Sequence, residues 1–156
     1  MQKVPLKQVV LLGSTSLVIL LHILSLALPY WTKTPYLYSG LFRVCTTVSS
    51  VSVCGDVEYK KDAIRAVIAF MFIGLIVLIA VLGLIIAFLT LLSSQSEQRK
   101  KIGLAISYGV AAICTMIAFA IYAGQLSGKN LHASFGLCVT NFILLLGLSG
   151  VSLVEF

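Results

Sequence analysis

Four long apolar runs constrain this chain more than any other feature. A helix needs about 20 predominantly apolar residues to cross a bilayer. The chain is 60% hydrophobic and 10% charged, whereas soluble domains carry roughly a quarter charged residues. With so few polar groups to cover a surface, lipid must be its solvent. We therefore predict an all-α transmembrane fold, one membrane domain with four spans at about residues 9–30, 63–92, 102–123 and 135–156.

Three polar segments separate the predicted spans: a first outer loop (31–62), a connector (93–101) and a second outer loop (124–134). With four spans, both termini lie on the same side as the connector. That side carries five Lys and Arg residues and the loop side six, so total charge hardly decides the orientation. Three of the five residues on the first side, Arg99, Lys100 and Lys101, lie together in the connector, which favours a cytosolic position for it.

The first outer loop contains two cysteines, Cys45 and Cys54, in a stretch rich in Thr, Val and Ser. If Ser49 and Ser50 form a two-residue turn, Cys45 faces Cys54, Thr46 faces Val53 and Val48 faces Val51. Directly opposed residues have Cβ atoms about 4.5–5.5 Å apart, close enough for a disulfide, although Ser-Ser is a poor turn pair beside Asn-Gly. Such a pair persists in oxidising compartments, which predicts an outer loop and cytosolic termini.

Several functional classes receive no support from the sequence. The scattered basic residues make no face suited to nucleic acid, and no ligand pair at short spacing predicts a metal site. Enzyme motifs such as the nucleophile elbow, HExxH and the P-loop are absent. We therefore expect no enzymatic activity, cofactor or small-molecule substrate. Small four-span enzymes that conjugate glutathione rank lowest, because the predicted cytosolic connector offers one Arg and no Tyr.

A few polar residues within or beside the spans need an interpretation. His22 and Asn141 are expected to bond to neighbouring helices, and Cys114 and Cys138 to be small buried residues at helix contacts. Arg65 is expected to pair with a loop acid or cap the strand layer. Asp56 and Glu58 could attract cations, although Lys60 and Lys61 largely cancel them, which favours a solvated surface run.

Taken together, the loop residues resemble a family signature. Trp31, then Gly40, Leu41 and Phe42, then Cys45 and Cys54 are similar to the W…GLW…C…C pattern of the claudin superfamily, and the segment 63–66 around Arg65 resembles the start of that family's second helix. The superfamily includes claudins, peripheral myelin protein, epithelial membrane proteins, lens fibre membrane intrinsic protein and calcium channel γ subunits. The resemblance implies a left-handed four-helix bundle with a small antiparallel sheet, the cysteine pair joining two strands.

The chain also departs from that pattern. Phe42 replaces the usual second Trp, and only eight residues separate Trp31 from Gly40. Claudins have a longer stretch there, so the chain is more similar to the short-loop branch of myelin, epithelial and lens proteins. That branch often has an Asn-linked glycan site, and no N-x-S/T sequence occurs here.

The first functional hypothesis is a plasma-membrane protein that organises cell–cell or lateral contacts. Besides membrane lipid, its partner would be a second copy or another membrane protein. Two alternatives remain open: an auxiliary, γ-like channel subunit, and a paracellular pore or barrier that uses Asp56 and Glu58.

Overall fold

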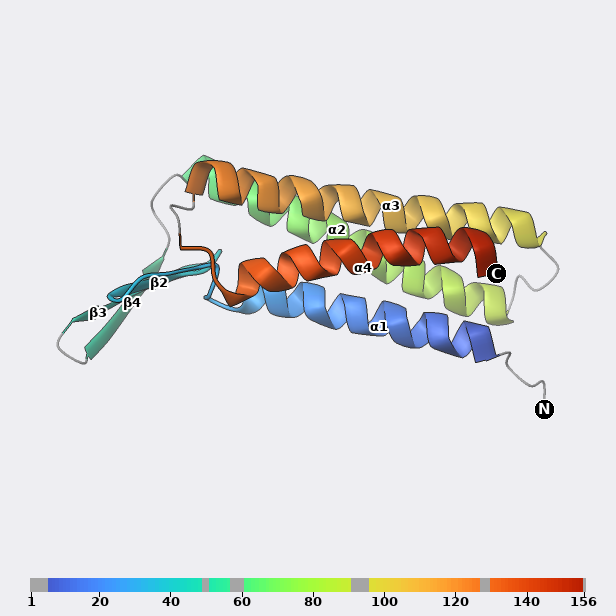
Figure 1. Cartoon of the computed structure of the whole chain (residues 1–156), viewed down its shortest axis with the longest axis horizontal. Helices are drawn as coiled ribbons and strands as arrows, with labels where there is room; N and C mark the ends of the chain where they lie inside the picture. Colours follow the sequence, from blue (N-terminus) through green and yellow to red (C-terminus); the bar gives the residue numbers. More distant parts are fainter. Residues whose placement is uncertain (1–5, 49–50, 57–60, 91–95, 127–129, 156) are drawn as a thin grey trace.

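The computed structural model describes residues 6–48, 51–56, 61–90, 96–126 and 130–155, and shows four long helices with a small sheet projecting from one end (Figure 1). All four helices are long and apolar enough to cross a membrane. The predicted fold class is thereby confirmed. The helices are α1 (Leu6–Ala27), α2 (Lys61–Thr90), α3 (Glu97–Ile121) and α4 (Ala133–Glu155).

The helices form a closed bundle. Helix α1 packs against α2 and α4, and α3 packs against the same two neighbours. The start of α1 and the end of α4 lie at the end of the bundle away from the sheet (Figure 1). We call the opposite end of the bundle the sheet end.

At two helix boundaries, the difference from the expected span has a clear local reason. Helix α1 ends at Ala27 rather than near residue 30, because the ring of Pro29 disfavours helical geometry in the residue before it. Helix α3 begins at Glu97, so Arg99, Lys100 and Lys101 are helical rather than part of a connector. The extended Ser96 starts that helix, and its carbonyl accepts hydrogen bonds from the N–H groups of Arg99 and Lys100 at 3.0 and 3.3 Å.

The sheet has four antiparallel strands in sequence order. The predicted register is confirmed: Cys45 lies opposite Cys54, Thr46 opposite Val53, and Val48 opposite Val51. The predicted turn residues Ser49 and Ser50 lie outside the described residues. The strands are β1 (Thr32–Lys33), β2 (Leu37–Ser39), β3 (Arg43–Val48) and β4 (Val51–Asp56).

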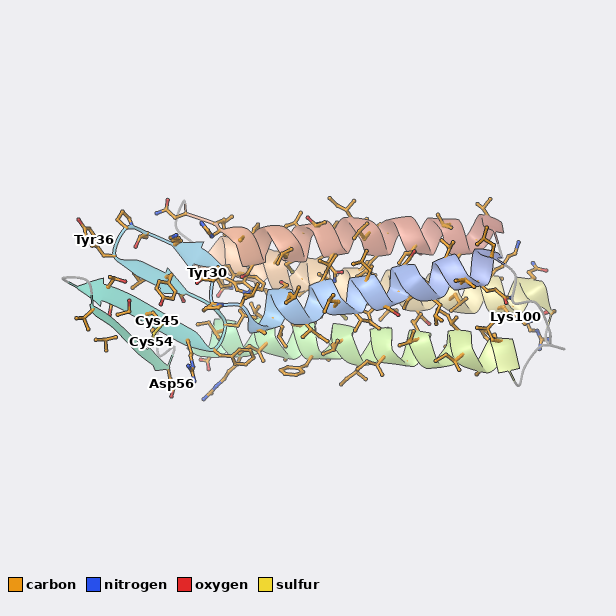
Figure 2. All side chains as sticks on the ribbon, turned by 90° about the horizontal axis from the view of Figure 1, so that it is seen from below. Tyr30, Tyr36, Cys45, Cys54, Asp56 and Lys100 are labelled. Atoms are coloured by element: carbon orange, nitrogen blue, oxygen red, sulfur yellow. A yellow bond between two sulfur atoms is a disulfide. The ribbon has the colours of Figure 1, made fainter. Side chains whose placement is uncertain are left out.

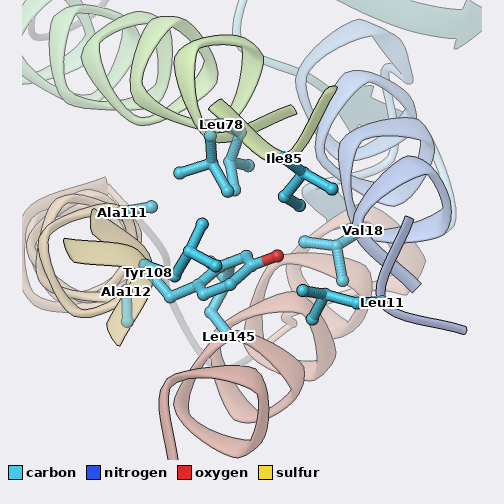
Figure 3. Packing of buried hydrophobic residues seen from close by; sticks show 10 residues of the cluster. Leu11, Val18, Leu78, Ile85, Tyr108, Ala111, Ala112 and Leu145 are labelled. Carbon is cyan, nitrogen blue, oxygen red and sulfur yellow. The ribbon is translucent and has the colours of Figure 1, made fainter. Parts of the chain in front are cut away.

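The half of the bundle away from the sheet is packed around Tyr108. This α3 residue is fully buried among aliphatic side chains of the other three helices (Figure 3). Its hydroxyl shares a hydrogen bond with Thr15 of α1. A buried hydroxyl without a partner is costly in an apolar interior, so Thr15 satisfies the one polar atom of this ring.

A second polar contact crosses the bundle between α1, α2 and α4. His22 Nε2–H donates to the backbone oxygen of Met71 at 2.9 Å, and Asn141 Nδ2–H donates to His22 Nδ1 at 2.8 Å. His22 and Asn141 are both fully buried, which confirms the prediction that they bond to neighbouring helices. Within the described part of the chain, the Asn141 side-chain oxygen has no partner.

This arrangement predicts a non-additive effect on stability. His22→Leu leaves the whole Asn141 amide unpaired, and we expect it to lower the free energy of unfolding by about 1 kcal/mol. Adding Asn141→Leu removes the stranded amide and should restore most of that loss. SDS titration of the detergent-purified protein measures both values. If the two single substitutions simply add, the coupling described here is wrong.

Candidate functional site

Trp31 lies where the chain leaves α1 and enters the sheet. Its side chain is fully buried, its indole N–H donates to the backbone oxygen of Ser25 at 2.8 Å, and its ring centroid lies 4.6 Å from that of Tyr122. Its backbone N–H donates to Ser39 O at 3.0 Å and its carbonyl accepts from His132 N–H at 2.9 Å. One residue therefore connects α1, the sheet, the short π-helix η1 (Tyr122–Leu126) that follows α3, and the start of α4.

In the Gly40–Phe42 segment, Gly40 and Leu41 are held against the rest of the fold, whereas Phe42 is exposed. Gly40 N–H donates to Arg43 O at 2.8 Å, which closes the turn between β2 and β3. A Cβ atom on Gly40 would lie 2.6 Å from the Pro29 Cα, so only glycine fits there. Leu41 is 2% exposed and packs in the same cluster as Trp31, whereas Phe42 is 44% exposed.

The hairpin of β3 and β4 carries the disulfide between Cys45 and Cys54 (Figure 2). The bond closes a short loop and limits the conformations of the unfolded hairpin. Because the same hairpin projects beyond the helices (Figure 1), few bundle contacts are available to hold its outer part. The disulfide is the covalent constraint that keeps this surface ordered.

Strand β4 is the edge of the sheet, and all six of its residues are exposed. Side chains alternate along a strand, so Val51 and Val53 share one face. The register places Val44 and Thr46 of β3 and Leu37 of β2 on that face too. We call these five residues the apolar face. The opposite face carries the disulfide, Tyr38, Arg43, Thr47, Ser52 and Asp56.

The second polar loop joins the other edge of the sheet, which the sequence did not indicate. Leu131 forms an isolated antiparallel bridge with Thr32 of β1. Lys33 N–H donates to Asn130 O at 3.1 Å. The side-chain hydroxyl of Thr32 in turn shares a hydrogen bond with Tyr122. Both polar loops thus contribute to one surface at the sheet end.

The charged candidates are spread around this end. Asp56 is exposed and lies opposite Arg43 in the register, so a cation near Asp56 would meet a neighbouring positive charge. Glu58 lies outside the described residues. Arg65 forms an exposed ion pair with Asp62 at 3.8 Å, and exposed pairs of this kind contribute little to stability. A cation-attracting role for Asp56 and Glu58 remains a prediction.

The remaining cysteines, Cys114 and Cys138, are unpaired and buried. The Cys138 thiol contacts the sulfur of Met71 at 3.8 Å. Over the described ranges, no cluster of three or more His, Cys, Asp or Glu side chains could hold a metal ion. Both thiols are buried in the helix bundle, in agreement with the prediction that they are small buried residues at helix contacts.

Four apolar helices carrying a disulfide-linked sheet at one end define a multi-pass membrane protein. The family model described as PMP-22/EMP/MP20/Claudin matches residues 6–145. The chain belongs to this family, which confirms the resemblance drawn from Trp31, the Gly40–Phe42 segment and the two loop cysteines. A search of curated proteins finds no match.

Proposed function

We propose that this protein is a non-enzymatic organiser of membrane contacts, and that the apolar face and the β4 edge bind a second copy of the chain or another membrane protein. The single observation that carries the proposal is the exposure of β4. Val51 and Val53 are 63% and 65% exposed on a strand whose outer edge has no partner strand among the described residues.

An edge strand is a ready template for binding. Its free backbone groups can pair with another strand, and side chains on one face then supply specificity. Covering an exposed valine contributes roughly 1.5 kcal/mol. The disulfide and the Trp31 anchor support the proposal because a surface that is ordered beforehand loses less entropy on binding.

We also propose the orientation of this surface. A disulfide persists in an oxidising compartment, which supports a sheet outside the plasma membrane. Both termini are then cytosolic, because the start of α1 and the end of α4 lie at the opposite end (Figure 1). Arg99, Lys100 and Lys101 begin α3 at that same end, in agreement with the excess of basic residues on cytosolic loops.

Crosslinking in intact cells tests the proposal. Cells expressing differently tagged copies are mixed and treated with a membrane-impermeant, amine-reactive crosslinker. We expect crosslinked species with the wild type, and a several-fold loss with Val53→Asp, because a carboxylate on the apolar face must be desolvated in the contact. Mixed tags in one product indicate contact between cells, and a single tag indicates contact within one membrane.

Ser52→Asp is the matched control, because Ser52 is the neighbouring exposed residue of β4 on the opposite face. It should crosslink as the wild type does. Equal loss for both variants would contradict the assignment to the apolar face. Failure of the impermeant reagent to label the monomer would instead contradict the orientation.

A further inference from the structure

Three aromatic rings meet at the base of the sheet, on the side of β1 and β2. The ring centroid of Tyr30 lies 5.6 Å from that of Tyr38 and 6.3 Å from that of His132. Tyr30 is 38% exposed and His132 is also exposed, while Tyr38 is half-buried. We call these three residues the aromatic cluster. It joins the end of α1, the sheet and the start of α4 in one open surface.

The aromatic cluster lies at the edge of the membrane-spanning part of the chain. The candidate span of α1 ends at Ala27 and that of α4 begins at Ala133, so Tyr30 and His132 both lie just beyond a span. Figure 2 places Tyr30 where the sheet meets the bundle, whereas Tyr36 lies much farther from the helices. The cluster is therefore at the level of lipid headgroups, where tyrosine is enriched in membrane proteins.

An exposed cation lies beside the cluster. Lys33 is exposed and lies opposite Tyr38 in the register of β1 and β2, so the two side chains share one face. No Asp or Glu occurs in residues 1–55 or 99–154, the segments that supply the cluster and its neighbours. On the same face, the described acidic residue Asp56 lies on the far edge strand β4, opposite Arg43. Lys33 is thus the charged group beside the cluster, and its positive charge attracts anions near the membrane.

We propose that the aromatic cluster and Lys33 bind the acidic sugar headgroup of a glycolipid in the adjacent leaflet. A sugar ring packs its C–H face against an aromatic ring and bonds through its hydroxyls to tyrosine O–H groups. The Lys33 ammonium pairs with the sulfate or carboxylate of the sugar in a charge-assisted hydrogen bond. This proposal rests on the orientation proposed above, because the ligand belongs to the non-cytosolic leaflet.

Lipid titration tests the proposal in a way that does not depend on orientation. The purified protein in detergent micelles is titrated with sulfatide, with galactosylceramide, which lacks the charge, or with phosphatidylglycerol, which lacks the sugar. Native mass spectrometry measures the bound lipid. We expect the tightest binding for sulfatide, weakened about tenfold by Lys33→Gln and clearly weakened by Tyr30→Leu, with Lys33→Arg retaining most of the affinity.

Two matched variants give the controls. Tyr36→Leu removes an exposed tyrosine at a distance from the cluster, and Arg65→Gln removes an exposed cation that already has Asp62 as partner. Both should bind sulfatide as the wild type does. Equal binding of sulfatide and phosphatidylglycerol, equal binding of sulfatide and galactosylceramide, or an equal loss in either control variant would overturn the proposal. Because the assay uses no partner protein, its failure leaves the proposed β4 contact untouched.

Discussion

Replacing Trp31 with alanine should lower the free energy of unfolding by about 3–5 kcal/mol, the range for truncating a large buried aromatic residue. The loss has three parts: the cavity beside Tyr122, the unmade bond from the indole N–H to Ser25 O, and weaker packing beside Leu41. The SDS titration described above measures it.

A second readout locates the effect at the sheet end. Cys138 is fully buried in the same cluster as Trp31, so maleimide should label it faster in Trp31→Ala than in the wild type, both carrying Cys114→Ser. Trp31→Phe keeps most of the ring and should lose much less stability. Phe42→Ala is the control, because Phe42 is largely outside this cluster. If Phe42→Ala costs as much as Trp31→Ala, the anchor is assigned to the wrong aromatic residue.

The parts of the fold that follow from repeating patterns could be predicted from the sequence. Hydropathy alone located the four helices, and the symmetry of Cys45 and Cys54 about Ser49 and Ser50 was enough to predict the strand register. Pro29 indicated a nearby helix end, although α1 stops slightly earlier. In each case the information is local. It lies in the hydropathy pattern of one segment, or in the spacing of a few residues that are close together in the sequence.

The contacts between distant segments could not be predicted. His22 and Asn141 were each expected to bond to another helix, but nothing identified them as each other's partner across 119 positions. The bridge between Thr32 and Leu131 joins single residues, so it leaves no alternating pattern in either segment. The aromatic cluster likewise depends on how α1, β2 and α4 converge, which no single stretch of sequence reveals.

Gly40 shows the same limit and gives the second large prediction. The sequence showed that Gly40 belongs to the motif, but not why a glycine is needed there. The structure gives the reason: a Cβ atom on Gly40 would lie 2.6 Å from the Cα atom of Pro29 and 3.1 Å from the carbonyl oxygen of Leu28. Both neighbours are backbone atoms, so no side-chain rotation can relieve the overlap. We expect Gly40→Ala to lower the free energy of unfolding by about 3 kcal/mol, the upper part of the range for overpacking.

The loss of structure should be greatest in the sheet, because Gly40 is the point where the β2–β3 turn meets the end of α1. Limited proteolysis should cut the sheet of Gly40→Ala much faster than that of the wild type, while circular dichroism shows the helices retained. Gly55→Ala is the matched control, since a Cβ atom on Gly55 of β4 meets nothing within 4 Å. Wild-type protease resistance in Gly40→Ala would mean that the sheet is held by the disulfide and Trp31 alone. Protease sensitivity in Gly40→Ala, but not in Gly55→Ala, would establish the close approach to Pro29 as part of what positions the binding surface.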